Sequence, residues 1–446
     1  MEVAEKSSTS LQKHFNAIRV KISGELNQVK RYGKVSSIIG TIIECTGLEA
    51  SVGEVYGIHT VMDTIVPAEV VGLKEGKTLL MPYDRVVGMK AGCKVESMGQ
   101  SLNVPVGFEL LGRVVDTNAE PIDGKGQIRV SGQMPVHNDP PAPLDRAPID
   151  DIMFTGIRAL DALNTVGTGQ RIGLFAGSGV GKSVLMGMIA KHSSADINVI
   201  ALIGERGREV QEFIHDTLGE EGLSRSVVVA ATSDSAAMSR VKGAFTATAI
   251  AEYFRDQGKN VLLMMDSVTR VAMAQREIGL ASGEPPTTKG YTPSVFTILP
   301  KLLERPGKTH KGSITGLYTV LVDNDDMNEP IADAVRSILD GHIVLSRRLA
   351  HKNHYPAIDI LESISRVMTK IVTPEQRQIA MKARELLATY REAEDLINIG
   401  AYVKGSNPKI DESIKKHPGL ESFLIQDLNE TDFSDDLWET LKKILE

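Results

Sequence analysis

A glycine-rich loop lies between an apolar run and a helical stretch near the middle of the chain. Residues 176–183 read Ala-Gly-Ser-Gly-Val-Gly-Lys-Ser and follow the apolar run 171–175. Glycines let consecutive backbone N–H groups converge on phosphate oxygens, and the helix that follows adds the positive end of its dipole. The pattern G-x-x-x-x-G-K-[ST] is met except at its first position, Ala176. The spacing predicts a binding site for a nucleoside triphosphate.

Two side chains of this loop have specific expected roles. Lys182 is placed to contact the β- and γ-phosphates, and the Ser183 hydroxyl is placed to bind Mg²⁺, the expected cofactor. The other predicted nucleotide-binding residues of the loop are Gly177, Ser178, Gly179, Val180, Gly181 and Val184.

Two carboxylates follow buried-strand patterns. The apolar run 261–266 ends in Asp266, which is predicted to join Ser183 in holding the metal ion. The run 198–203 precedes Glu205, which places this carboxylate at the strand edge where open α/β sheets bind ligands. Glu205 is therefore predicted to be the general base that activates water. A surface ion pair with Arg206 is the alternative interpretation, and the position after a buried strand argues against it.

Composition narrows the class of protein. The 446 residues provide enough core for two or three domains, and a net charge of −7 with a pI of about 5.9 argues against binding nucleic acid through bulk charge. Aromatic residues make up only 4%, so stacking surfaces for single strands are scarce. Cys45 and Cys93 stand apart without a metal-site pattern. No signal-peptide or membrane-span pattern is present, so a cytoplasmic location is expected.

Changes in composition predict five parts. Residues 1–24 form a partner-binding arm, and 25–93, rich in short Val, Ile and Thr runs, form a small β-barrel. Residues 94–149 form a connecting segment. Residues 150–347 alternate strands with helices, as in a mostly parallel α/β sheet, and 348–446 form an all-α domain. The prolines that stiffen the connecting segment are Pro135, Pro140, Pro141, Pro143 and Pro148.

Within these parts, two helices are predicted over 208–218 and 235–256. An amphipathic helix is also predicted after Pro374, from apolar residues at spacings of three and four. Those residues are Ile379, Ala383, Leu386, Tyr390, Ala393 and Ile397.

Several longer segments resemble the rotary ATPase α/β family, from about residue 25 to about residue 425. The segments that carry this resemblance are 202–209, 265–270, 283–286 and the ten-residue signature 356–365. Within that family, 326–333 and 396–402 resemble the type III export ATPases, and 396–402 looks flagellar more than virulence-associated.

The resemblance implies a RecA-like P-loop core and a role for further residues. It identifies Arg366 as an arginine finger that reaches a neighbouring subunit's site, although a lone arginine is usually a solvated or paired charge. Arg206 and Arg270 resemble the arginines near the γ-phosphate and the catalytic water. Tyr355 and Tyr402 match positions where the family packs a ring against adenine, although a buried tyrosine is more often part of a core.

The resemblance also implies the biological role. It indicates an ATPase of the flagellar type III export apparatus that unloads and unfolds export substrates. The implied partners are five further copies in a homo-hexamer, a stator-like regulator on the N-terminal arm, a coiled-coil stalk in the ring pore, export-gate membrane proteins, and export substrates with their chaperones, with no direct nucleic acid. The loop 281–293 is a candidate for contacting the stalk, and an ordinary surface loop is the alternative. Attachment to the inner face of the cytoplasmic membrane would come through these partners.

Four alternatives share parts of this pattern. A virulence secretion ATPase would share nearly all of it. A non-catalytic rotary subunit would lack the carboxylate at Glu205, and a proton-coupled synthase subunit would lack the export-like segment 400–406. A ring RNA translocase would need an N-terminal RNA-binding face, which the acidic pI and the few aromatic residues disfavour.

Overall fold

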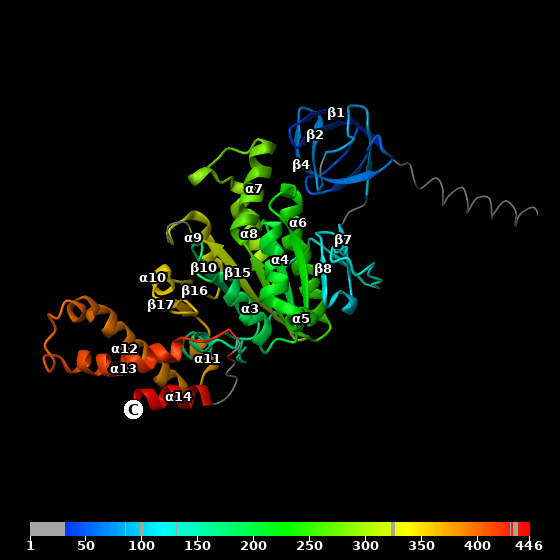
Figure 1. The fold of residues 1–446 in the computed structure, drawn as a ribbon. Helices are drawn as coiled ribbons and strands as arrows, with labels where there is room; N and C mark the ends of the chain where they lie inside the picture. The colour runs from blue at the N-terminus through cyan, green and yellow to red at the C-terminus, as the bar shows by residue number, and fades with distance from the viewer. Residues whose placement is uncertain are drawn as a thin grey trace, which may run out of the picture. The chain divides into compact units, whose positions relative to one another are not determined.

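The computed structural model describes residues 32–84, 86–98, 102–130, 132–322, 326–428, 430 and 436–446. The chain divides into two compact units, residues 1–100 and 101–446 (Figure 1). The predicted arm 1–24 lies outside the described residues.

The described part of the first unit is a closed β-barrel with strand order β1-β2-β5-β4-β3-β6. Its strands are β1 Tyr32–Ile39, β2 Ile42–Thr46, β3 Val55–His59, β4 Ile65–Lys74, β5 Lys77–Pro82 and β6 Lys94–Ser97. The predicted boundary at residue 93 precedes β6, which closes the barrel by pairing with both β1 and β3. This strand was missed because its four residues, Lys-Val-Glu-Ser, carry one apolar side chain. Cys45 and Cys93 are free thiols buried in the barrel.

The described part of the second unit is built on a nine-stranded sheet with the order β17-β16-β10-β15-β13-β11-β12-β8 and with β14 beside β15. The strands are β8 Arg113–Val115, β10 Arg171–Ala176, β11 Ile197–Ile203, β12 Ser226–Ala231, β13 Asn260–Asp266, β14 Gly307–Lys308, β15 Ser313–Leu321, β16 Gly341–Leu345 and β17 Ile358–Ser365. Neighbours from β16 to β8 along this order run parallel, whereas β17 and β14 are antiparallel to their partners. The carboxyl ends of β10, β11, β13 and β15 therefore meet at one edge.

Helices of the central domain cover the sheet. The longest, α6, packs on β11, β12 and β13 and against α7. The helices are α2 Arg158–Leu163, α3 Lys182–His192, α4 Gly207–Glu212, η2 Phe213–Leu218, α5 Gly219–Ser224, α6 Ala237–Asp256, α7 Val268–Ser282, η3 Thr288–Gly290, α8 Pro293–Leu303, α9 Pro330–Ile338 and α10 Arg347–His351.

The helix predicted over 208–218 is split into α4 and a π-helical turn, η2. Thr217 of this turn packs against Gly187 of α3, where a Cβ would lie 2.1 Å from the threonine Cγ2. Gly187 therefore permits a close approach of η2 to the helix that follows the phosphate loop.

The connecting segment forms β7 Asn103–Val106, the short helix η1 Phe108–Leu110, β8 and β9 Gly132–Pro135, with β7 and β9 paired to each other. Its carboxyl part is fixed to the core by Arg305, which is fully buried. The Arg305 guanidinium donates to both Glu252 oxygens, at 2.9 and 2.6 Å, and to the Val136 carbonyl at 2.7 Å. A buried arginine is stable only when its donors are satisfied in this way.

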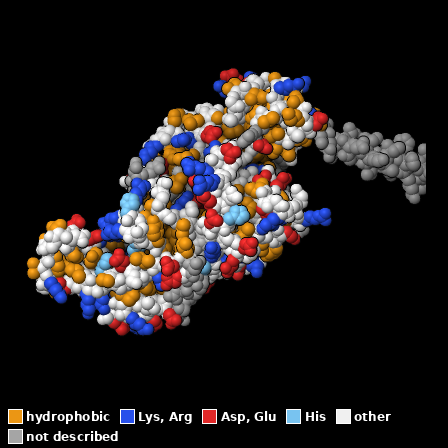
Figure 2. Space-filling model, viewed as in Figure 1, with side chains coloured by type: hydrophobic (Ala, Val, Ile, Leu, Met, Phe, Trp, Pro, Cys, Tyr) orange, Lys and Arg blue, Asp and Glu red, His pale blue; other side chains and the backbone are white. Residues whose placement is uncertain are grey.

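The C-terminal helices are α11 Met368–Ile371, α12 Pro374–Asn398, α13 Pro408–Leu424 and α14 Asp436–Leu445. A capping box of Thr373 and Gln376 begins α12, which packs along α13 (Figure 1). Unlike the all-α domain predicted from residue 348, this region also contributes β17 to the sheet. Hydrophobic side chains are exposed at the far end of the α12–α13 hairpin, at the left of Figure 2. They include Leu396, Ile399 and Val403. No helix of the described ranges is both long and apolar enough to cross a membrane.

Candidate nucleotide site

The glycine-rich loop connects the end of β10 to the start of α3. Gly179 and Gly181 have φ of 78° and 88°, a conformation that disfavours residues with a Cβ. Gly181 is the N-cap of α3, and its carbonyl accepts the Leu185 N–H at 3.0 Å. The loop thus presents its backbone at the N-terminal end of an eleven-residue helix, where anions are favoured.

Lys182, Glu205 and Asp266 come together at this edge of the sheet. The Lys182 ammonium donates to Asp266 Oδ1 and lies 3.9 Å from Glu205 Oε1. Their side chains are 13%, 14% and 5% exposed for Lys182, Glu205 and Asp266. One buried cation is thus shared by two carboxylates, an arrangement that leaves the lysine ready to pair with a stronger anion.

The environment of Glu205 raises the pKa of its carboxyl to about 7, first through burial and then through the charge of Asp266 and a hydrogen bond with Glu209. Lys182 and Arg270 act in the opposite direction. The same hydrogen bond lowers the pKa of Glu209. A pKa close to the working pH suits a general base. Sequence reasoning missed Glu209, although a second glutamate one helical turn after Glu205 is a usable signal.

A cavity of about 150 Å³ opens beside these groups. Ser183, Glu205, Glu209 and Asp266 line it, together with Leu202, Val210, Glu212, Phe213 and Thr217. A hydroxyl and a carboxylate suit Mg²⁺, which usually takes few protein oxygens and completes its shell with phosphates and water. Within the described residues no group of three or more His, Cys, Asp or Glu could hold a metal ion. The Ser183 hydroxyl and the Asp266 carboxylate fit a metal ion that arrives with a nucleotide.

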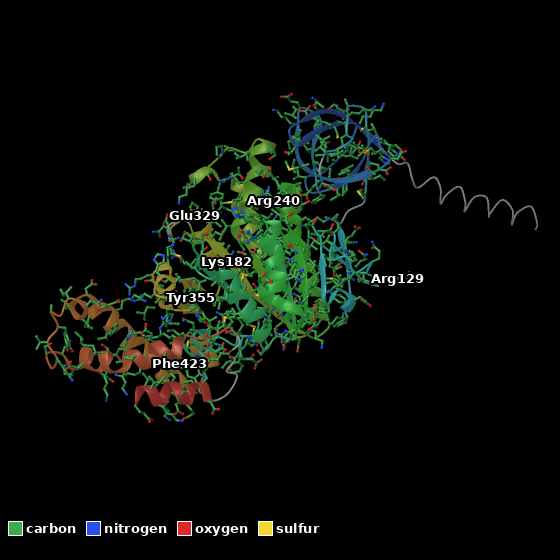
Figure 3. The ribbon with its side chains drawn as sticks, viewed as in Figure 1. Arg129, Lys182, Arg240, Glu329, Tyr355 and Phe423 are labelled. Carbon is green, nitrogen blue, oxygen red and sulfur yellow. The ribbon has the colours of Figure 1, made fainter. Side chains whose placement is uncertain are left out.

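An apolar pocket of about 320 Å³ lies next to the loop. Tyr355, which is 41% exposed, borders it, and a Cβ on Gly181 would lie 3.3 Å from the tyrosine ring. Figure 3 labels Tyr355 close to Lys182. Flat apolar walls beside a phosphate loop suit a purine base. The other lining residues are Val184, Leu185, Met188, Leu345, Pro356, Ala357, Gln426, Asp427 and Leu428.

Gln426 holds the C-terminal segment against this pocket. Its amide accepts the Arg158 N–H at 2.9 Å and donates to the Gly156 carbonyl at 2.7 Å, and its own N–H donates to the Tyr355 carbonyl at 3.0 Å. Arg158 also pairs with Glu430 at 2.5 Å. Sequence reasoning missed Gln426 because a single glutamine after a helix carries no pattern.

Tyr402 lies away from the pocket, on the loop between α12 and α13. Its hydroxyl bonds to the Asn407 carbonyl and to Asp411 Oδ1, each at 3.0 Å. Of the two tyrosines expected against adenine, only Tyr355 borders the pocket within the described residues.

The two arginines expected near the γ-phosphate differ in position. Arg270, in the first turn of α7, packs over Gly204, where a Cβ would lie 2.8 Å from the arginine Cβ, and its charge acts on Glu205. The Arg206 side chain is 81% exposed and pairs with Glu209 at 3.2 Å. The ion pair considered for Arg206 is thus present, but its partner is Glu209 rather than Glu205.

Arg366 lies at the opposite edge of the sheet from the phosphate loop. Because β17 is antiparallel to β16, its last residue, Ser365, pairs with Gly341 at the beginning of β16. Next to it, β10 continues through Gly173, level with His342, to Ala176 before the loop begins. At about 3.3 Å per residue, Arg366 is more than about 10 Å from its own loop along the strand direction. The side chain is exposed, and no described residue accepts a hydrogen bond from it.

Comparisons with known proteins agree with this architecture. Residues 156–365 match the nucleotide-binding domain of the ATP synthase alpha/beta family, residues 35–99 match the beta-barrel domain of that family, and residues 372–443 match the T3SS EscN ATPase C-terminal domain.

Similar proteins span nearly the whole chain. A flagellum-specific ATP synthase of Bacillus subtilis is 60% identical over 90% of this chain and 92% of the relative. That of Treponema pallidum is 54% identical over 91% of each chain, and a type 3 secretion system ATPase of Xanthomonas euvesicatoria is 50% identical over 93% of this chain and 94% of the relative.

Among solved structures, the assembled ATPase EscN of the enteropathogenic E. coli type III secretion system superimposes with a TM-score of 0.86 at 48% identity. The match covers 93% of this chain and all of that chain. The expected fold class, a barrel followed by a RecA-like core and a helical domain, is confirmed. The expected function in flagellar export is also confirmed, and the virulence alternative is not better supported. The chain belongs to the ATP synthase alpha/beta family and, within it, to the ATPases of the flagellar and type III export systems.

Proposed function

We propose that this export ATPase hydrolyses Mg²⁺-ATP at sites shared between neighbouring copies in a ring of six. The observation that carries the proposal is the position of Arg366, which is exposed at the sheet edge opposite the loop of its own chain. An arginine that neutralises charge on the γ-phosphate would then come from the adjacent copy. EscN has been solved as an assembled ATPase, which supports a multi-subunit form.

In the proposed binding step, the triphosphate lies along the loop Gly177–Gly181 with its base in the apolar pocket beside Tyr355. Lys182 leaves Asp266 for the β- and γ-phosphates, because several phosphate charges attract the ammonium more strongly than one carboxylate. Mg²⁺ would be held by Ser183 and Asp266 and would neutralise phosphate charge. Backbone N–H groups of the loop complete the contacts to phosphate.

In the proposed hydrolysis step, Glu205 accepts a proton from the water that attacks the γ-phosphate in line. Burial keeps this carboxylate poorly solvated, and Glu209 shares its proton in the resting site. Arg270 lies beside Glu205 and would orient the water or the phosphate. We assign Arg206 no contact with the nucleotide in its own site, because its side chain is 81% exposed and pairs with Glu209. A role toward a neighbouring copy is a further proposal.

The proposed partners rest on the relatives and on exposed surfaces. EscN has been solved in complex with its central stalk EscO. Here the segment 281–293 joins the end of α7 to the start of α8, and Leu280 and Phe296 are exposed on either side of it. This segment is the proposed stalk contact. The exposed apolar end of the α12–α13 hairpin would suit unfolded export substrates or their chaperones. We also propose that residues 1–24 bind a stator-like regulator and that the ring contacts export-gate proteins. These contacts would place it at the cytoplasmic membrane. We propose no direct binding of nucleic acid.

Mixing two inactive variants tests the shared site. Glu205→Gln lacks the base and Arg366→Ala lacks the finger, so each alone should be nearly inactive. In mixed rings some interfaces combine an intact Glu205 with an intact Arg366. For random assembly and independent interfaces, hydrolysis should return toward about a quarter of the parental rate. Arg377→Ala, another exposed arginine, is the matched control and should keep parental activity. No recovery in verified mixed rings would contradict independently acting shared sites.

Complementation tests the export role. A Bacillus subtilis strain without its 60% identical relative should regain motility and secretion of flagellar proteins when it expresses this chain. The Arg366→Ala variant, made at the same level, should not restore either. Failure of the parent chain at normal expression would argue against exchangeable export function between the two proteins.

A further inference from the structure

Thr319 is a buried hydroxyl next to the metal-binding edge. It lies on β15, which runs between β10 and β13, and it follows Tyr318, the residue paired with Met265. Thr319 therefore stands beside Asp266, and its side chain is fully buried. Its hydroxyl donates to Asp266 Oδ1 at 2.7 Å.

Both donors to the Asp266 carboxylate use the same oxygen. Oδ1 accepts the Thr319 hydroxyl and the Lys182 ammonium, whereas no described residue donates to Oδ2. The carboxylate is thus held by one oxygen while the other stays available. Because Mg²⁺ demands near-octahedral geometry, the direction of the available oxygen matters for its shell.

A buried threonine hydroxyl usually donates its hydrogen bond to a backbone carbonyl. Thr246 and Thr248 do so on α6, at 2.8 Å each. Thr319 also has a carbonyl within reach, that of Met265, at the longer distance of 3.3 Å. The shorter bond to the charged oxygen shows that the hydroxyl serves the carboxylate first, since hydrogen bonds to charged groups are the stronger ones.

We propose that Thr319 is a positioning residue that fixes Asp266 so that Oδ2 faces the metal ion of the Mg²⁺-nucleotide. The proposal rests on the binding step above, in which Lys182 moves from Asp266 to the phosphates. At that moment Asp266 loses its charged donor and Thr319 remains. The site thereby keeps the carboxylate oriented both before and after nucleotide binding.

Calorimetric titration of the full chain with ADP, in Mg²⁺ and separately in EDTA, tests this assignment. The parent should bind ADP more tightly with Mg²⁺. Thr319→Val keeps the shape and strand preference but removes the hydroxyl. We call the ratio of the ADP affinity in Mg²⁺ to that in EDTA the Mg²⁺-dependent gain. In Thr319→Val this gain should be smaller than in the parent by a factor on the order of 10, while the affinity in EDTA changes less than about twofold. Thr319→Ser should restore the gain.

Thr315→Val is the matched control. Thr315 lies on the same strand and is also buried. Its hydroxyl accepts the Gly169 N–H at 2.8 Å, at the end of the strand opposite the phosphate loop. Its variant should keep the Mg²⁺-dependent gain, so general damage to β15 is separated from the loss of orientation. Thr319→Ala supplies a second hydroxyl-free variant if valine does not fold.

Each outcome of these titrations either supports or overturns the role of Thr319. Equal losses with Mg²⁺ and with EDTA, an unchanged gain in Thr319→Val, or the same loss in Thr315→Val would overturn the role of Thr319 while leaving the proposed function intact. A parent that binds ADP equally with and without Mg²⁺ would overturn the metal role of Asp266, and the Thr319 assignment with it.

Discussion

The phosphate end and the base end of the nucleotide site are built in opposite ways. At the phosphate end, charged groups are buried and paired with one another, with Lys182 between Asp266 and Glu205. At the base end, the wall includes apolar side chains of α3 and the Tyr355 ring. The neutral amide of Gln426 holds the segment after α13 against this pocket. If ATP binds as proposed, it rearranges charges at the first end and only fills space at the second.

This difference separates chemistry from affinity. In the proposed mechanism, groups at the phosphate end change partners when ATP binds and when water is activated, so losing one should affect the rate. Groups at the base end make contacts that stay the same in the ground state and in the transition state, and such contacts change binding alone. Substitutions at the two ends should consequently alter different kinetic parameters.

The largest effect is expected for Lys182→Ala. The variant should lose measurable hydrolysis and bind ATP about 10²-fold more weakly, because charge-assisted bonds to two phosphates disappear. Phosphate release and equilibrium titration with ATP measure the two effects. Lys191→Ala, in the last turn of the same helix, is the matched control and should behave as the parent. Retained turnover in Lys182→Ala would contradict the assignment of the site.

Glu205→Gln should lower kcat by a factor of about 10² to 10⁴ while ATP binding stays close to parental, since the amide keeps the shape but cannot accept the proton. Single-turnover hydrolysis and a binding titration separate the two. Binding that falls together with turnover would mean that Glu205 contacts the nucleotide instead of activating water.

The contrast between the two ends also explains what the sequence could predict. The loop 176–183 is a contiguous motif, and Glu205 and Asp266 follow continuous apolar runs. The motif and the hydrophobic pattern were therefore enough to locate these residues along the chain. The fold class followed from the same alternation of strands and helices. At the base end, Gly181, Tyr355 and Gln426 come from three distant parts of the chain, and only the fold brings them together.

Other features were missed for local reasons. Thr319 looked like an ordinary β-branched strand residue, because a propensity for strands does not reveal a bond to a neighbouring strand. The π-helical turn after α4 packs closely against Gly187 of another helix, and a local pattern does not reveal such a contact. The sequences of β6 and β17 are too short or too polar to be recognised as strands. The resemblance placed Tyr402 beside adenine, whereas the bonds of its hydroxyl keep it on the hairpin loop.

A pair of tyrosine substitutions sharpens the contrast at the base end. Tyr355→Ala should raise the Kd for ATP about 10-fold and leave kcat within about twofold, because stacking on a base contributes to binding without taking part in the reaction. Tyr402→Ala is the natural comparison and should change either value less than twofold. Fluorescent-nucleotide titration and steady-state kinetics measure both. A larger effect for Tyr402 would show that the hairpin loop reaches the base, in the chain or in the ring.

The smallest change at optimal pH is expected for Glu209→Gln, and it appears in the pH profile. Glu205 must be deprotonated to act as a base, and its pKa is raised to about 7, so kcat/KM of the parent should rise as the pH increases through about 7. The hydrogen bond with Glu209 is one cause of the raised pKa, after burial and the charge of Asp266. Removing the Glu209 carboxylate should therefore shift the acid limb to lower pH, and the variant should keep more of its maximal activity below pH 7 than the parent.

The matched control for this shift is Glu212→Gln. Glu212 lines the same cavity but pairs with Arg208 at 2.7 Å, and the main causes of the raised pKa of Glu205 are burial and other groups. Its profile should coincide with that of the parent. The titration of ATP itself is common to all three proteins, so it cancels in the comparison. An acid limb that stays in place or moves to higher pH in Glu209→Gln would show that Glu209 does not hold the proton of Glu205. The raised pKa of Glu205 would then rest on burial and Asp266 alone.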